Sequence, residues 1–207
     1  KGKGACPERG IMLKWLQRPS QNQPPAPDTA LPEGWFAPQS AEQLLATPLR
    51  QSCLHQLRQL TPLPDTLFDS WILTAIHSFA ALVQLLPASQ SHHHSIPGGL
   101  LDHSLEVACN AIRLRQGYLL PPEAGAEEQA RQASAWTVAV VCAALLHDTG
   151  KIAVDMEIHQ RDGTRWHSWQ GNLAQPYRWQ YQSHGRDYHL HPAAGSMLIN
   201  QLIPSPL

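Results

Sequence analysis

Hydrophobic residues recur at helical spacing along most of the chain after Ser40. Residues 40–60 open with a serine cap and are interrupted by Pro48, so the sequence predicts helical structure on both sides of that proline. Residues 64–89 are apolar on nearly every side. A helix that is apolar all round is normally buried, and this stretch is therefore predicted to be a central buried helix.

Two further helices are predicted in the second half of the chain. In residues 98–118 the apolar side chains fall on one face, which indicates an amphipathic helix with His103 at the edge of the apolar band. Residues 123–149 begin amphipathic and become apolar on every side. Gly150 follows directly and is predicted to be the C-terminal cap of that helix.

The hydrophobic pattern changes in residues 154–187. Asp-Gly and Gly-Asn turn signals alternate there with aromatic residues typical of strands, which predicts a β-hairpin or a small sheet. A last helix is predicted after His191, with Pro192 at its first position. The fold class is therefore mainly α, a helical bundle with a small β-hairpin insertion.

Composition divides the chain into two parts. Residues 17–39 contain six of the eighteen prolines, so residues 1–39 are predicted to be a proline-rich arm or linker and residues 40–207 the helical domain. The sequence stops just after a predicted helix, and we expect the chain to be a fragment of a longer protein. It has no run of eighteen uninterrupted apolar residues, and no membrane span is expected.

Charge and cysteine content narrow the function classes. The net charge of −1 gives no general basic surface, which counts against bulk nucleic-acid binding. Four cysteines occur without a CxxC pair, so neither a zinc-thiolate site nor a disulfide framework is expected. Buried Cys109 and Cys142 in a reducing compartment fit a cytoplasmic protein. Twelve histidines are the most unusual feature of the composition.

The segment "LLHDTGK", residues 145–151, places His147 and Asp148 at the end of a buried helix. A carboxylate beside an imidazole is costly to bury unless something pairs with both. Imidazole and carboxylate are good ligands for divalent first-row metals, so one interpretation is a metal site. The alternative is a His-Asp pair that only caps the helix.

The flanking residues favour the metal site. "HSLEVA" from His103 followed by "HDTGK" resembles the HD hydrolase superfamily, in which an earlier histidine and the His-Asp doublet bind metal in an all-helical fold. The resemblance implies His103, His147 and Asp148 as ligands, with Lys151 placed to meet a substrate phosphate. "HPAAGSMLI" resembles a segment of two-metal members and implies His191 as a further ligand. The alternative for His191 is a helix-capping role.

A narrower resemblance covers the chain from about residue 32 to its end. "SHHHSIPGGLLDHSLEVA", "ALLHDTGK", "DGTRWHSWQG" and "RDYHLHPAAG" together resemble the N-terminal domain of HD-type, triple-histidine conjugative relaxases of integrating conjugative elements and plasmids. This implies a cytoplasmic phosphodiesterase that nicks one DNA strand at a transfer origin with other conjugation proteins. The cofactor implied is one or more divalent ions, Mn, Mg or Fe.

The triple histidine run adds candidate catalytic residues, His92, His93 and His94. Rings of an extended loop cannot all point the same way, so either His92 and His94 together or His93 alone would face the scissile phosphate. Histidines there could protonate the leaving oxygen. The alternative is that all three are solvent-exposed loop residues.

Arginines and aromatic residues alternate in the predicted hairpin. Aromatic faces can stack on unpaired bases while arginines contact the backbone. The predicted single-strand DNA contacts are Arg161, Arg165, Trp166, Trp169, Arg178 and Trp179. The alternative is that the tryptophans form a small core under the hairpin, and different rings could do either.

Three functions remain open from sequence. The first is the relaxase domain, with a metal-bound water as the nucleophile. If a tyrosine is the nucleophile instead, the candidates are Tyr118, Tyr177, Tyr181 and Tyr188, and Tyr188 is preferred. The second is an HD phosphohydrolase acting on nucleotides or cyclic dinucleotides, and the third is a non-catalytic DNA- or partner-binding module. The last aspartate of the superfamily pattern is expected beyond residue 207, since Asp155 and Asp187 lie too near the other motifs.

Overall fold

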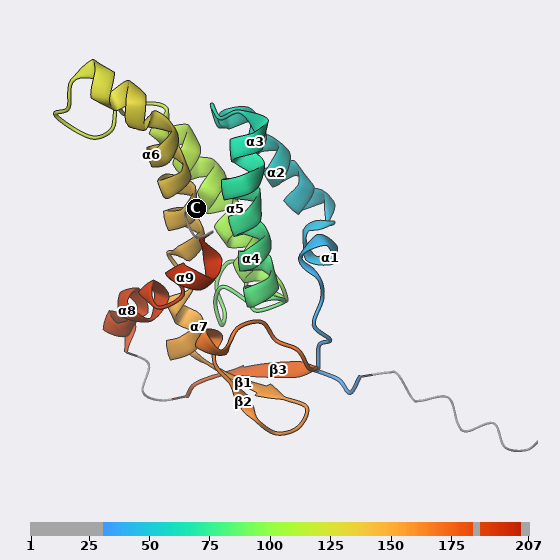
Figure 1. Ribbon diagram of the computed structural model, residues 1–207. Helices are drawn as coiled ribbons and strands as arrows, with labels where there is room; N and C mark the ends of the chain where they lie inside the picture. The colour runs from blue at the N-terminus through green and yellow to red at the C-terminus, as the bar shows by residue number, and fades with distance from the viewer. Residues whose placement is uncertain (1–30, 184–186, 204–207) are drawn as a thin grey trace, which may run out of the picture. The chain divides into compact units, whose positions relative to one another are not determined.

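The computed structural model describes residues 31–183 and 187–203. The chain divides into two units, Lys1–Pro32 and Glu33–Leu207, and the features below belong to the second unit. Most of the predicted proline-rich arm lies outside the described residues. Within the second unit the prediction of a mainly α fold with a small β insertion is confirmed (Figure 1).

The first two helices are set by their caps. Helix α1, Ala41–Leu45, begins after Ser40, whose side chain accepts from the amide of Gln43 in a capping box. Helix α2, Pro48–Leu60, begins at the proline itself, with Thr47 as its N-cap. Pro48 therefore starts a second helix, because the first helical position needs no amide donor.

The central buried helix is shorter than the sequence predicts. It comprises α3, Asp65–Leu67, a π-helical segment at Phe68–Leu73, and α4, Thr74–Val83. Gln84 ends it with a left-handed φ of 49°. The Gln84 side-chain amide donates to the carbonyls of Ala81, at 2.8 Å, and Gln39, at 3.0 Å. The first bond satisfies a carbonyl of the last turn of α4, and the second ties the helix end to the segment before α1. The helix ends at Val83, so the predicted extension to residue 89 is wrong.

Helices α5, Gly99–Arg115, and α6, Ala126–Leu146, pack against each other. The short helix α7, Gly150–Val154, follows α6 after a turn. Gly150 is thus the first residue of α7, and its prediction as the C-terminal cap of α6 is wrong. A Cβ on Gly150 would lie 2.0 Å from the carbonyl oxygen of His191, so the glycine permits a close backbone approach.

The small sheet predicted for residues 154–187 is found within residues 156–181, and it is antiparallel and three-stranded in the order β2-β1-β3. The strands are β1, Met156–Gln160, β2, Arg165–Trp166, and β3, Tyr177–Tyr181. Phe36 bridges to Tyr177 through two backbone hydrogen bonds, of 2.8 and 2.9 Å. Its ring also stacks on Trp179 at 4.5 Å, so the end of the arm is pinned to β3.

Short helices complete the chain. Two are single 3-10 turns, Ser168–Gln170 and Tyr188–Leu190. Helix α8, His191–Ser196, has Pro192 in its first turn, and α9, Ile199–Leu202, follows. Figure 1 shows α8 and α9 beside the lower half of α6, with the sheet below them.

The hydrophobic core lies between α2, α4, α5 and α6 and continues under the sheet. Cys53, Cys109 and Cys142 are buried and free, and burial was predicted for Cys109 and Cys142. Two helical stretches, Asp65–Val83 and Ala126–Val154, are long and apolar enough to cross a bilayer by composition alone. The buried share of each window is 44%. Core helices of folded domains have the same length and composition, so these two helices do not establish a membrane span.

Candidate metal centre

Three predicted ligands from two distant segments converge at one point. His103 lies in the second turn of α5, and His147 and Asp148 follow the end of α6. His103 Nε2 is 3.2 Å from His147 Nε2, and each nitrogen is 3.4 Å from Asp148 Oδ2. Ligands bonded to one metal ion at about 2.1 Å lie roughly 3.0 to 3.4 Å apart. The spacing of these atoms fits a divalent cation.

The tautomer of His147 is fixed by the backbone. Its Nδ1 lies 2.6 Å from the carbonyl oxygen of Ala144, which can only accept a hydrogen bond. Nδ1 therefore carries the proton, and the lone pair of Nε2 points at His103 and Asp148. A ligating histidine commonly donates its other N–H in this way, which orients the ring.

The surroundings of His103 favour its neutral form. Burial lowers the pKa of its imidazole below the usual value, and the attraction of Asp148 opposes this effect. The neighbouring His147, His94 and Lys151 lower the pKa further. A neutral imidazole is the form that binds a metal, so the environment favours a ligand role.

Lys151 lies against the same carboxylate. Its Nζ donates to Asp148 Oδ2 at 2.6 Å, and the Asp148 side chain is 14% exposed. The lysine supplies a positive charge to the buried carboxylate. It is also on the rim of the cluster, one turn along from the doublet, from which it can reach an anionic group bound there.

The histidine run contributes one ring to this region. His94 is half-buried, its ring lies 5.3 Å from that of His103, and His92 and His93 are exposed. His94 is therefore the ring of the run that lies beside His103, and the catalytic assignment of His92 and His93 stays a prediction. The carbonyl oxygen of His94 lies where a Cβ on Gly99 would be, at 2.1 Å, so the glycine pair lets the loop reach α5.

Glu106 belongs to the same region and was missed by sequence reasoning. Its Oε2 is 3.3 Å from His94 Nε2. The signal that would have found it is its position three residues after His103, on the same face of α5. The acidic side chain orients His94 beside His103.

His191 is not brought into the cluster. Its Nε2 bonds instead to Asp155 Oδ1 at 2.9 Å, and Asp155 is buried. His147 and His191 line one pocket of about 500 Å³, which is otherwise mainly apolar. Asp155, which was not expected from the sequence to take part in the site, is thus the partner of His191. The assignment of His191 as a metal ligand stays a prediction.

The tyrosines differ in their access to this region. Tyr177 is fully buried and accepts a hydrogen bond from the amide of Leu85 at 3.0 Å, and burial raises its pKa to about 12. It is therefore a poor nucleophile. Tyr188 is 66% exposed, and its ring meets His191 edge-on at 5.4 Å.

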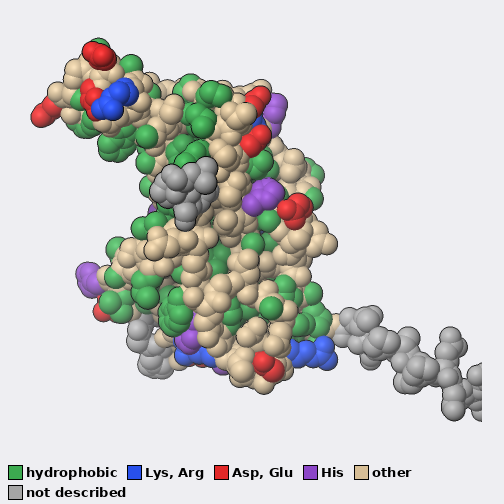
Figure 2. All heavy atoms as spheres, viewed as in Figure 1, with side chains coloured by type: hydrophobic (Ala, Val, Ile, Leu, Met, Phe, Trp, Pro, Cys, Tyr) green, Lys and Arg blue, Asp and Glu red, His purple; other side chains and the backbone are tan. Residues whose placement is uncertain are grey.

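The predicted DNA-contacting residues divide between the two faces of the sheet. Arg165 and Arg178 both pair with His159 in register, so these three residues share the outer face. Trp166 is 4% exposed and Trp179 stacks on Phe36, which favours the small core under the hairpin for these two rings. Figure 2 shows basic side chains at the lower edge of this view, where the sheet lies.

Two predicted contacts that lie outside the strands are accessible. Trp169 is 48% exposed and stacks on His167 with ring centroids 4.4 Å apart and planes 7° apart. Arg161 is exposed in the turn after β1. Among the predicted tryptophans, Trp169 has the exposed face that stacking on a base requires.

The fold and the cluster together define a mainly helical domain with a candidate centre for a divalent metal. Residues 34–207 match the model of the TraI_2 family, described as "putative helicase", and the chain belongs to this family. The family is TraI-related, which makes this a domain related to conjugation relaxases. No curated protein matches the sequence.

Proposed function

We propose that this domain is the metal-dependent nicking domain of an HD-type conjugative relaxase, cleaving one DNA strand at a transfer origin. The observation that carries the proposal is the convergence of His103, His147 and Asp148 on one point in a TraI-related domain. A helicase motor needs a phosphate-binding Gly-rich loop, and these 207 residues contain no Gly-x4-Gly-Lys-Ser/Thr sequence.

The residues of the site fit the chemistry of phosphodiester cleavage. A divalent cation would supply Lewis-acid polarisation of the phosphoryl oxygens and a water of lowered pKa. His103, His147 and Asp148 would hold the ion, and Lys151 would contact a non-bridging phosphate oxygen. His94, oriented by Glu106, lies beside His103 and would protonate the leaving oxygen.

The DNA strand would be bound by the sheet. Arg165 and Arg178 would contact the backbone, Arg161 would extend this contact at the turn, and Trp169 would stack on an unpaired base. His191 lines the pocket next to His147, and Asp155 is the hydrogen-bond partner of His191. We propose that this side of the site accommodates the nucleotide adjoining the scissile phosphate. If the site holds two metal ions, the second ion would bind at His191.

The first test is metal content after loading with manganese or iron, measured by elemental analysis with His147→Ala as control. Stoichiometric metal in the parent protein and its loss from the variant would support the site. Supercoiled plasmid carrying a transfer origin, compared with the same plasmid without it, then tests nicking. Metal binding without origin-dependent nicking would reject the relaxase function.

A second candidate is hydrolysis of nucleotides or cyclic dinucleotides. The pocket of about 500 Å³ beside His147 favours it, because a mainly apolar hollow of this size suits a small ligand. Competition between single-stranded oligonucleotides and nucleotides for the metal-loaded protein separates the two. Preference for the nucleotide, with release of phosphate, would favour the second candidate.

A further inference from the structure

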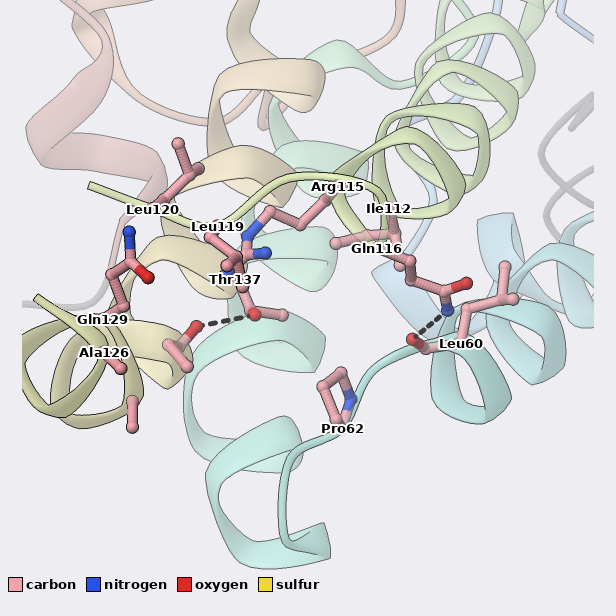
Figure 3. Close-up of a pocket in the computed structure, with 12 residues that line it drawn as sticks. Leu60, Pro62, Ile112, Arg115, Gln116, Leu119, Leu120, Ala126, Gln129 and Thr137 are labelled. Atoms are coloured by element: carbon pink, nitrogen blue, oxygen red, sulfur yellow. Dashed lines mark hydrogen bonds between the residues drawn. The ribbon is translucent and has the colours of Figure 1, made fainter. Parts of the chain in front are cut away.

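A different pocket lies at the opposite end of α5 and α6 from the candidate metal centre (Figure 3). It has a volume of about 430 Å³ and is enclosed by the end of α2, the end of α5, the loop after α5 and the start of α6. Small-molecule pockets in proteins are typically of this size. Neither the family match nor the proposed function assigns a role to it.

The body of the pocket is apolar. Ala126, Ala130 and Ala133 of α6 line it, and their spacing places them on one face of the helix. Leu60, Ile112 and Leu119 enclose it from the other segments. Short side chains on α6 leave room between the helices that leucines would fill.

Arg115 is the cation of this pocket. It is the last residue of α5, and Figure 3 shows its guanidinium reaching across towards Thr137 and Leu119. One nitrogen, Nη1, donates to the carbonyl oxygen of Tyr118 at 2.6 Å. The Nε atom is buried and has no hydrogen-bond partner in the described part of the chain, and no carboxylate there pairs with this arginine.

The other polar donors of the pocket are already used. The side-chain amide of Gln116 donates to the Leu60 carbonyl at 3.1 Å, and that of Gln129 donates to Pro121 at 3.2 Å. The Thr137 hydroxyl donates to Ala133 at 2.8 Å. The unmatched requirement of the pocket is therefore one anionic group at Arg115, beside an apolar body.

We propose that this pocket binds a small monocarboxylate with an apolar body, of the class of medium-chain fatty acids. The carboxylate would accept from the Arg115 guanidinium, after a small shift that exposes the buried Nε, and the hydrocarbon would lie along the α6 alanines. A charge-assisted bond of this kind satisfies a partly buried guanidinium. Nucleotides carry several charges, and the pocket supplies one cation for them.

This site is separate from the proposed nicking function. Arg115 lies twelve residues from His103 on α5, which corresponds to about 18 Å along the helix axis. Metal content therefore provides an independent readout, and it is expected to be the same in every pocket variant. Loss of nicking activity would leave the ligand measurement unaffected.

The test is isothermal titration calorimetry of the protein with decanoate and with decan-1-ol, each below its aggregation threshold. Decanoate is expected to bind at least about tenfold more tightly than the alcohol, which corresponds to about 1.4 kcal/mol. Arg115→Gln is expected to reduce that ratio to about one while the alcohol still binds. Ala133→Leu fills the pocket and is expected to weaken both ligands about tenfold.

Matched controls come from neighbouring residues. Arg113→Gln removes an exposed arginine that bonds to Asn110 and Gln56, and the preference for decanoate should persist. Ala135→Leu alters a separate apolar hollow lined by Leu67 and Trp71, with no expected effect. Thermal unfolding verifies that each variant is folded, and Ala130→Leu replaces Ala133→Leu if the latter is not.

Three results with the parent protein and the Arg115→Gln variant would overturn the proposal. They are no binding of decanoate to the parent protein, equal binding of decanoate and decan-1-ol, and a decanoate preference that survives Arg115→Gln. Unchanged binding in a folded Ala133→Leu or Ala130→Leu variant would place the ligand elsewhere and would reject this pocket as well.

Discussion

Two groups of histidine and aspartate side chains each contribute one histidine to the same pocket, and they differ in how their nitrogen and oxygen atoms are paired. In the first, His103, His147 and Asp148 present three ligand atoms to one another at 3.2 to 3.4 Å. In the second, His191 and Asp155 bond directly at 2.9 Å. In the first arrangement, two imidazole nitrogens face one carboxylate oxygen that Lys151 also contacts, whereas in the second one imidazole pairs with one carboxylate. The same residue types therefore form two different geometries, of which only the first brings three candidate ligand atoms together within the described residues.

The largest expected effect comes from the shared carboxylate of the cluster. Asp148→Ala should weaken binding of manganese or iron by about 100-fold or more, because a ligand is lost, with little change in the fold. Elemental analysis and thermal unfolding measure the two effects. Asp155→Asn is the matched control and should retain metal within about threefold. Full metal occupancy in Asp148→Ala would remove the cluster as a metal site.

A smaller effect is expected at Lys151. Lys151→Met should leave metal content near that of the parent protein and lower nicking about 100-fold, because a cation that contacts the phosphate is removed. Gel conversion of supercoiled to open-circular plasmid measures it. If metal content falls together with nicking, the lysine acts on Asp148 alone and its proposed phosphate contact is wrong.

A tenfold effect is expected at the histidine loop. His94→Asn should lower nicking about tenfold with metal retained, because a general acid is lost. His92→Asn is the matched control, since His92 is exposed, and it should change nicking less than twofold. Equal effects of the two variants would show that His94 has no role beyond that of its neighbours.

The smallest effect is expected beside the His191–Asp155 pair. Tyr188→Phe should nick within about twofold of the parent rate, since a metal-bound water is the proposed nucleophile. A denaturing gel with labelled DNA detects any covalent protein–DNA adduct. Such an adduct in the parent protein, absent from Tyr188→Phe, would make this tyrosine the nucleophile and reverse the order of the predictions.

Local patterns predicted the elements well, and the convergence of His103 with the His-Asp doublet followed from family resemblance. The amphipathic pattern of residues 98–118 corresponds to α5, and the turn signals of residues 154–187 correspond to the sheet. These features depend on neighbours in sequence. The end of α4 at Gln84 could not be predicted, because it depends on Gln39, forty-five residues away.

The remaining differences also arise from contacts distant in sequence. Gly150 resembles a helix cap locally, but the approach of the His191 backbone decides its role. His191 pairs with Asp155 across thirty-six residues, and no spacing rule reports that bond. Trp166 and Trp169 are both tryptophans of the same short segment, yet Trp166 packs in the core and Trp169 is exposed.

The bridge between Phe36 and Tyr177 has a consequence for self-association. β3 is an edge strand of the sheet, and an unpaired edge offers its amides and carbonyls to another chain. The Phe36 backbone covers part of that edge, and its ring covers Trp179. A chain shortened to begin at Ser40 would expose both, and edge-to-edge pairing of two such chains would follow at high concentration. We therefore expect Phe36 to limit edge-to-edge association of the sheet.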